Sequence, residues 1–365
     1  HKEYRRQRQM CIRDRYYSGF DVFRYLTLRI ILSALTALTI SLIIGPIIIN
    51  YLISKKLYQS IREDGPKSHI DEKSKTPSMG GVIIIFSIII SSLLWGDIFN
   101  EYIWILSFVL LTFGMIGFYD DYQKFINSSS DGISGKTKLI FQIALSGIVA
   151  YYIFITSTNP TELSLTMPFL KNFSLYLGIL FIPWTILVII GSSNAVNLTD
   201  GLDGLAILPC ILIAAAFVLF AYVEGNFNIA NYLLIPYLPG VSEIAIFSSA
   251  VVGSGLGFLW YNSYPAQVFM GDVGSLSLGA VLATIAVLLR LEIVYALMGG
   301  VFVMEALSVM IQVTSYKLFK KRVFRMSPIH HHFELKGWPE PKIIVRFWII
   351  TFILVLIALA SLKIR

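Results

Sequence analysis

Apolar runs of about twenty residues constrain this chain more than any other feature of its sequence. A helix of that length crosses the roughly 30 Å of hydrocarbon in a bilayer. Hydrophobic residues make up 56% of the chain and charged residues only 14%, which is too much apolar surface for a water-soluble domain. We therefore expect an all-α integral membrane protein, with about ten transmembrane helices. The runs lie near residues 25–51, 79–95, 102–119, 138–156, 173–193, 205–223, 243–260, 274–290, 293–316 and 343–362.

Lys and Arg are distributed unevenly among the connections between these runs. Cytoplasmic loops are the ones enriched in Lys and Arg, and the connections 54–78 and 317–342 are strongly basic. The alternate connections near 96–101, 157–172, 224–242 and 291–292 hold almost none, apart from Lys171 and the flanking Arg290. With ten spans, this pattern predicts that both termini lie outside the cytoplasm.

Residues 1–15 contradict that orientation, because six of them are Lys or Arg. Such a tail favours a cytoplasmic N-terminus when taken alone. The later loops outweigh it, so we interpret 1–15 as a non-native basic tail, with a genuine solvated tail as the alternative. Residues 16–365 are expected to form a single polytopic membrane domain. The first apolar run is too long for a signal peptide and lacks a small-residue cleavage site, so it should remain as a span.

A cluster of amides and carboxylates interrupts the apolar sequence between the fifth and sixth runs. Asn194, Asn197, Asp200 and Asp203 recur at every third position, which in a helix places them roughly on one face. The glycines of this segment let a ligand or backbone approach closely. Ionisable residues at membrane depth are costly and by default mark a functional site. The segment is therefore expected to hold a cation or a phosphate.

Three further carboxylates lie at predicted ends of spans. Asp120 and Asp121 are adjacent, and two like charges so close require a compensating cation, unless they mark only a solvated helix end. Asp272 directly precedes an apolar run, where it can serve as an ordinary N-cap. Beside glycines at a helix N-terminus it can instead hold Mg²⁺ that bridges to a phosphate. We therefore expect Asp272 to be a metal ligand.

Three consecutive histidines, His330, His331 and His332, lie in the last basic loop. Neighbouring side chains diverge along the backbone, so they cannot easily share one metal ion. Imidazoles can instead donate hydrogen bonds to a diphosphate or polar headgroup. We expect a short ordered loop that lines a cleft.

Two other positions are candidates for substrate contact. Lys75 and Thr76 offer a cation and a hydroxyl to a phosphate, although Lys75 can equally be a plain cytoplasmic anchor. Glu305 interrupts the ninth apolar run and should face the protein interior. Gly299 and Gly300 before it permit a bend in that helix.

Apart from Glu305, which lies within a span, these polar groups fall on the predicted cytoplasmic side. Carboxylates, amides, a lysine and histidines at helix ends suit phosphoryl transfer, in which catalysis is mostly positioning plus neutralisation of developing charge by Mg²⁺ and cationic groups. Embedding in a membrane would supply a lipid substrate.

At these residues the chain resembles the polyprenyl-phosphate N-acetylhexosamine-1-phosphate transferase superfamily. Its marks are an Asp-Asp pair at the end of a span and an Asn-x-x-Asn-x-x-Asp-Gly-x-Asp-Gly segment. Within the superfamily the chain is most similar to the phospho-N-acetylmuramoyl-pentapeptide transferase family of bacterial peptidoglycan synthesis. The resemblance covers residues 16–365, and its distinctive stretches are 76–81, 194–205, 267–275 and 327–334.

The resemblance implies a multi-pass protein of the bacterial inner membrane, with ten helices and both ends in the periplasm. It also implies the reaction. UDP-N-acetylmuramoyl-pentapeptide and undecaprenyl phosphate react with Mg²⁺ to give lipid I and UMP, with no nucleic-acid partner. Homodimerisation is a further expectation at the level of the family.

The resemblance also assigns roles to residues of this chain. Asp272 matches the Mg²⁺ ligand, and Asp120 and Asp121 match a pair that handles the lipid phosphate or the metal. The remaining candidates match the nucleotide and catalytic segment, or positions that line the cleft: Asn194, Asn197, Asp200, Asp203, Lys75, Thr76, Asn262, Glu305, His330, His331 and His332.

Two alternatives stay open at the level of sequence. A polyprenyl-phosphate N-acetylglucosamine-1-phosphate transferase shares the acidic motifs, although the 329–334 segment argues against it. A transporter also places carboxylates in a membrane, but it typically gathers them near the midplane and is often built from repeated halves. We find no such repeat in the sequence.

Overall fold

Helices account for almost all of the regular structure in the chain. The structure is a computed structural model, and it describes residues 22–58, 76–127, 132–157, 159–169 and 174–363. The predicted basic tail at 1–15 and Lys75 therefore lie outside the described residues. The long helices are α2 (Leu26–Ser54), α4 (Gly81–Trp95), α5 (Glu101–Ile126), α6 (Gly135–Thr156), α7 (Phe181–Thr199), α8 (Ile207–Glu224), α10 (Ser242–Asn262), α11 (Gly271–Leu288), α13 (Gly300–Phe319) and α15 (Glu340–Ala360).

Nine helices within the described ranges are long and apolar enough to cross a membrane. The chain is thus an all-α integral membrane protein, as the apolar runs predicted. The run at 79–95 forms α4, which has only 15 residues and is shorter than a usual span. The run at 293–316 is not one helix. It divides at Gly299 into α12 (Glu292–Met298) and α13, at the bend that the two glycines predicted.

Helix α11 forms the axis of the bundle. It packs against α4, α5 and α7, and every residue from Val273 to Leu288 is buried. Small residues permit this packing at its first turn, because a Cβ on Gly117 of α5 would collide with the backbone carbonyl of Asp272. A Cβ on Gly81 of α4 would likewise collide with the backbone of Gly274. Three helix backbones therefore meet at the start of α11.

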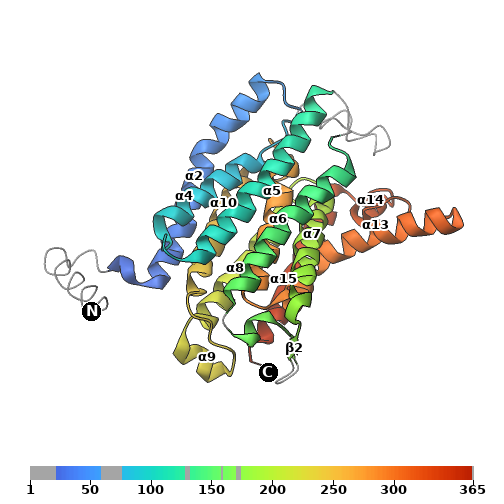
Figure 1. Cartoon of the computed structure of the whole chain (residues 1–365). Helices are drawn as coiled ribbons and strands as arrows, with labels where there is room; N and C mark the ends of the chain where they lie inside the picture. Colours follow the sequence, from blue (N-terminus) through green and yellow to red (C-terminus); the bar gives the residue numbers. More distant parts are fainter. Residues whose placement is uncertain (1–21, 59–75, 128–131, 158, 170–173, 364–365) are drawn as a thin grey trace.

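One end of the bundle carries structure that the sequence did not predict. A two-stranded antiparallel sheet joins β1 (Ser164–Thr166) to β2 (Ser174–Tyr176), with Leu165 opposite Leu175. Two short 3-10 helices, η2 (Pro160–Leu163) and η3 (Gly178–Leu180), flank it. The short helix α9 (Phe227–Leu233) lies at the same end, where α2 begins and α15 ends (Figure 1).

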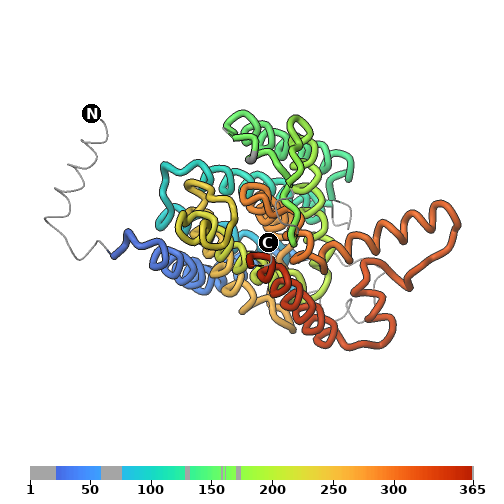
Figure 2. The backbone as a smooth tube through the Cα atoms, turned by 90° about the horizontal axis from the view of Figure 1, so that it is seen from below, coloured from blue at the N-terminus to red at the C-terminus, as the bar shows by residue number. Residues whose placement is uncertain are grey.

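Helix α13 leaves the bundle and projects to one side, and the chain returns through α15 (Figures 1 and 2). Between them lies α14 (Ile329–Glu334), which contains the three histidines. The expected histidine loop is therefore a short helix. Side chains of α13 secure the returning segment, because Gln312 binds the backbone of Val323 and Phe324.

Candidate active site

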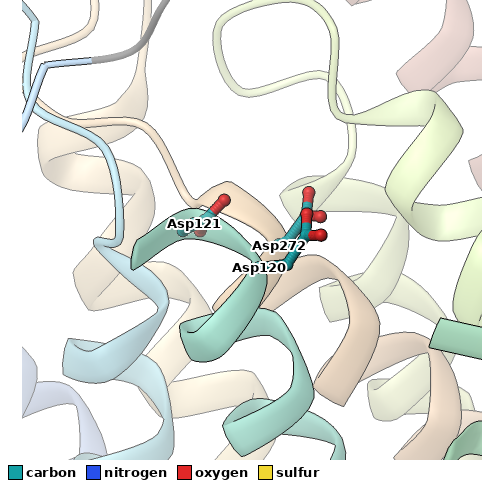
Figure 3. Close-up of side chains that lie close together, drawn as sticks. All are labelled: Asp120, Asp121 and Asp272. Atoms are coloured by element: carbon teal, nitrogen blue, oxygen red, sulfur yellow. The ribbon is translucent and has the colours of Figure 1, made fainter. Parts of the chain in front are cut away.

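Three carboxylates meet where α5 lies against the first turn of α11 (Figure 3). Asp120 and Asp121 are buried within α5, which continues to Ile126 and so does not end at the pair as predicted. Asp272 lies in the first turn of α11 and is not its N-cap, since Met270 takes that position. One oxygen of each carboxylate lies within 4.8 Å of the others. We call these three residues the carboxylate cluster.

Two lysines hold the carboxylate cluster together. Lys124 Nζ lies 2.7 Å from Asp120 Oδ2 and 3.1 Å from Asp272 Oδ2. It also lies 3.3 Å from Asp121 Oδ1. Lys138 of α6 lies 2.7 Å from the same Asp272 oxygen. When all five groups are ionised, three negative charges face two positive ones, so the cluster retains an excess negative charge.

The remaining oxygens of the carboxylate cluster accept hydrogen bonds from the protein. Asn197 Nδ2 donates to Asp272 Oδ1 at 2.7 Å, and the amide of Ile133 donates to Asp120 Oδ1 at 2.8 Å. The cluster therefore offers carboxylate oxygens to a cation, and these ligands suit a hard divalent ion such as Mg²⁺.

A glycine and a short paired segment shape the entry to α11. Gly271 has φ of +70°, and a Cβ there would lie 2.5 Å from Asp121 Oδ2. Only glycine adopts this conformation without cost and leaves the carboxylate room. The segment that begins at Thr76 runs alongside, since the amides of Gly80 and Gly81 donate to the carbonyls of Phe269 and Met270 at 2.8 and 2.9 Å. Thr76 is therefore carried toward the start of α11.

The expected single helical face from Asn194 to Asp203 is wrong, because α7 ends at Thr199. Asn197 faces the carboxylate cluster, whereas Asn194 donates to Gln142 of α6 at 2.9 Å. Asp200 and Asp203 lie in the turn that follows the helix. A spacing of three residues no longer implies a common face once the helix has ended.

The turn after α7 is anchored to two other segments. Asp203 Oδ2 accepts the amide of Ala266 at 3.0 Å, and the amide of Asp203 donates to Glu340 at the start of α15. Asn262 accepts the amide of Gly204 at 3.1 Å and donates to the carbonyl of Val268 at 2.9 Å. Asp203 and Asn262 thus hold the walls of the site in the structure, and their predicted substrate contacts stay predictions.

Asp200 extends the acidic region beyond the carboxylate cluster. Burial raises the pKa of Asp200 to about 8, and the negative charges of Asp272 and Asp121 contribute to this rise. At neutral pH the carboxyl group therefore holds its proton and can donate a hydrogen bond as well as accept one.

The three histidines have separate partners. His330 is fully buried, with Nδ1 3.1 Å from Glu305 Oε1. His331 Nδ1 lies 2.6 Å from Glu334 Oε2, and His332 Nδ1 accepts the amide of Arg325 at 3.1 Å. The side chain of His330 packs on the turn after α7, against Gly201. The three histidines therefore bind three different partners, although the ring centroids of His330 and His331 lie 4.2 Å apart, and the argument against a shared metal ion stays a prediction.

Sequence reasoning missed the two lysines. Neither Lys124 nor Lys138 is among the candidate residues selected from the sequence. The spacing of Asp120 and Lys124 is that of an ion pair across one helical turn, so this signal was present in the sequence. The partnership of Lys138 with Asp272 spans 134 positions of the chain and left no local signal.

Two matches with protein families bear on this site. Residues 103–290, just over half of the chain, match the model of glycosyl transferase family 4. That stretch contains all three residues of the carboxylate cluster. Residues 73–85 match the phospho-N-acetylmuramoyl-pentapeptide-transferase signature 1, which covers the segment that pairs with the entry to α11. The chain therefore belongs to glycosyl transferase family 4, and its signature identifies it as a translocase of the phospho-N-acetylmuramoyl-pentapeptide-transferase type.

Proposed function

We propose that the chain transfers phospho-N-acetylmuramoyl-pentapeptide from its UDP-linked form to undecaprenyl phosphate, with lipid I and UMP as products. The family matches already identify a phosphosugar transferase of peptidoglycan synthesis. The observation that supports the finer proposal is the carboxylate cluster, held by Lys124 and Lys138 near the ends of membrane helices. A polyprenyl phosphate presents its charged group at such a position.

Asp120, Asp121 and Asp272 would hold Mg²⁺ in this proposal. Their oxygens approach within 4.8 Å of one another, and the two nearby lysines leave one negative charge over. When bound, the ion neutralises charge on the diphosphate of the nucleotide substrate. Lys124 and Lys138 would then be released toward phosphate oxygens, because the cation would take over their carboxylate partners.

The proposed reaction is a direct displacement at phosphorus. An oxygen of the lipid phosphate forms a bond to the sugar-linked phosphorus, and the bond from that phosphorus to the UMP oxygen breaks with its electron pair. A phosphate monoester has a second pKa of about 6, so the acceptor is largely dianionic at neutral pH and hardly needs a base. Asp120 would position this acceptor or remove its residual proton.

A two-step route through an aspartyl phosphate is the alternative for the same site. Trapping experiments separate the two routes. Incubation with the nucleotide substrate alone, without lipid, should leave no phosphorylated Asp. A phosphorylated Asp120 formed under these conditions would overturn direct displacement.

The proposal places the site at the cytoplasmic face of the bacterial inner membrane, with both termini in the periplasm. The distribution of basic residues supports this orientation. So does the arrangement of the helices, because α2 begins and α15 ends at one end of the bundle, while α5 runs from that end toward the carboxylate cluster (Figure 1). Homodimerisation stays a prediction.

UMP release by the purified protein in nanodiscs tests the proposal. We expect release only when UDP-N-acetylmuramoyl-pentapeptide, undecaprenyl phosphate and Mg²⁺ are all present, and loss of release when the ion is chelated. Turnover of UDP-N-acetylglucosamine alone would instead assign the chain to the N-acetylglucosamine-1-phosphate transferases. Transport of a substrate without UMP release would identify a transporter.

A further inference from the structure

The carboxylate of Glu305 is fully buried, and helix α14 occupies both of its oxygens. Oε2 accepts the amide of Ile329 at 2.8 Å, and Oε1 lies 3.1 Å from Nδ1 of His330. An ionised carboxylate can only accept hydrogen bonds. An ionised Glu305 therefore requires the proton of the imidazole on Nδ1.

The other edge of the His330 ring leads to the same tautomer. Nε2 is buried and has no hydrogen-bond partner among the described residues. A Cβ on Gly201 would collide with Nε2, so one Cα–H bond of this glycine, which occupies the direction of the missing Cβ, points at that nitrogen. A proton on Nε2 would meet this hydrogen, whereas a lone pair accepts it as a weak hydrogen bond. Both edges select neutral His330 with its proton on Nδ1.

This arrangement differs from the second anchor between α13 and the returning segment. Gln312, seven residues after Glu305, accepts the amides of Val323 and Phe324 through Oε1 at 3.0 and 2.9 Å. Gln312 therefore secures backbone only. Glu305 also sets the protonation of a side chain that packs on the turn carrying Asp200 and Asp203.

We propose that Glu305 is a positioning residue that acts through His330. Its carboxylate holds the imidazole as the Nδ1–H tautomer, with bare Nε2 packed on Gly201, and so fixes the turn after α7 beside the carboxylate cluster. The inference rests on the proposed function only in treating that turn as part of the transferase site. It gives Glu305 a task that requires no contact with substrate.

The tautomer can be measured on the unaltered protein in nanodiscs. ¹⁵N NMR of histidine-labelled protein, with His330 assigned by comparison with His330→Gln, should show a protonated Nδ1 and a bare Nε2 at neutral pH. The reverse pattern, or two protonated nitrogens, would overturn the inference whatever the activity. Because this experiment uses no substrate, its outcome is independent of the proposed function.

Three variants test the consequence for the reaction. Glu305→Gln has one side-chain oxygen, whereas the amide of Ile329 and Nδ1–H of His330 each need an acceptor. The oxygen should keep the amide of Ile329, and the NH₂ group should then donate to Nδ1. The imidazole proton would therefore move to Nε2, which faces Gly201. We expect kcat/KM for UMP release to fall about tenfold to hundredfold. Glu305→Asp should restore part of the activity together with the Nδ1–H signal.

Gln312→Leu is the matched control, since it loosens the same segment from the same helix without touching His330. Its His330 spectrum should match that of the unaltered protein. Glu305→Gln with unchanged kcat/KM, or with reduced kcat/KM and an unchanged tautomer, would refute the positioning role.

Discussion

Two buried charged sites, one at each end of the helix bundle, are arranged differently. At the end where α2 and α10 begin, Arg29 binds both oxygens of Glu243, at 2.7 and 3.1 Å. The amide of Asp97 also donates to Glu243, at 2.8 Å. One cation therefore meets one anion in a bidentate ion pair, and Arg29 also donates to the carbonyl of Trp95 at 3.2 Å.

At the other end three carboxylates share two lysines. Asp272 Oδ2 accepts from both Lys124 and Lys138, while Asp120 and Asp121 crowd the same space. Like charges at such distances repel, and among the described residues Lys124 and Lys138 leave this end with an excess of negative charge when all five groups are ionised.

The contrast separates a structural ion pair from a reactive site. An ion pair in which each charge is matched contributes to folding and carries no net charge that would attract a ligand. A cluster with surplus charge stores an unfavourable interaction that a bound cation relieves, and perturbed groups of this kind concentrate at functional sites. Substitutions at each end test whether the two ends can be separated by experiment.

The largest effect is expected for Asp272→Asn. It removes the carboxylate that both lysines and Asn197 contact, so UMP release should fall by at least about 100-fold. The remaining two carboxylates are then balanced by two lysines, and the midpoint of thermal unfolding should stay unchanged or rise. Full activity of this variant would show that Asp272 is not a metal ligand. A large loss of stability would contradict the view that this end carries surplus negative charge.

Gly117→Ala should disturb the same end through packing alone. Its Cβ would collide with the backbone carbonyl of Asp272, so α5 and α11 must separate. Overpacking of this kind costs about 1–3 kcal/mol, and both activity and the unfolding midpoint should fall. Gly191→Ala on α7 is the matched control, because no atom lies within 4 Å of its added Cβ. Equal behaviour of the two variants would contradict the close approach of the helices.

Glu243→Gln should affect stability and leave activity per folded molecule intact. The variant leaves Arg29 half-buried without its full charge partner, which costs about 2 kcal/mol. We expect a drop of roughly 5 °C in the unfolding midpoint in detergent. Glu101→Gln makes the same substitution at an exposed position of this end and should change little. Activity lost in parallel with stability would mean that the two ends are coupled.

The smallest effect concerns His332, in the segment that returns from α13. Burial, together with the positive charges of Lys336 and Arg325, holds the pKa of His332 below its usual value. His332 therefore binds a proton more readily in the unfolded chain than in the folded one. Because of this difference, the free energy of unfolding declines as pH falls below about 6.5. When the pH falls from about 7.5 to 5.5, the unfolding midpoint of the unaltered protein should drop. The drop for His332→Gln should be smaller by roughly 1–2 °C. An identical decline in both would show that other groups govern the acid response.

Much of the site's composition could be predicted from local patterns. Asp120, Asp121 and Asp272 were each selected as carboxylates beside apolar runs, and the structure brings them together. Lys124 could have been predicted from its spacing to Asp120. The departure of Asp200 and Asp203 from the helix could not, because the end of α7 at Thr199 carries no strong stop signal before Gly201.

The sequence by itself determined that this is a membrane protein built from helices, where those helices lie and where one of them bends. These properties follow from hydrophobicity and glycine content over short windows, which act within a single segment. Only the tertiary structure decided which charges share a site. The ion pairs of Asp272 with Lys124 and Lys138, and the contact of Glu305 with His330, join residues that are distant in the chain. The first pairs form because glycines let α4 and α5 pack closely against α11. The second contact forms because the segment after α13 brings α14 back to the turn after α7. Neither packing arrangement is encoded in a local pattern.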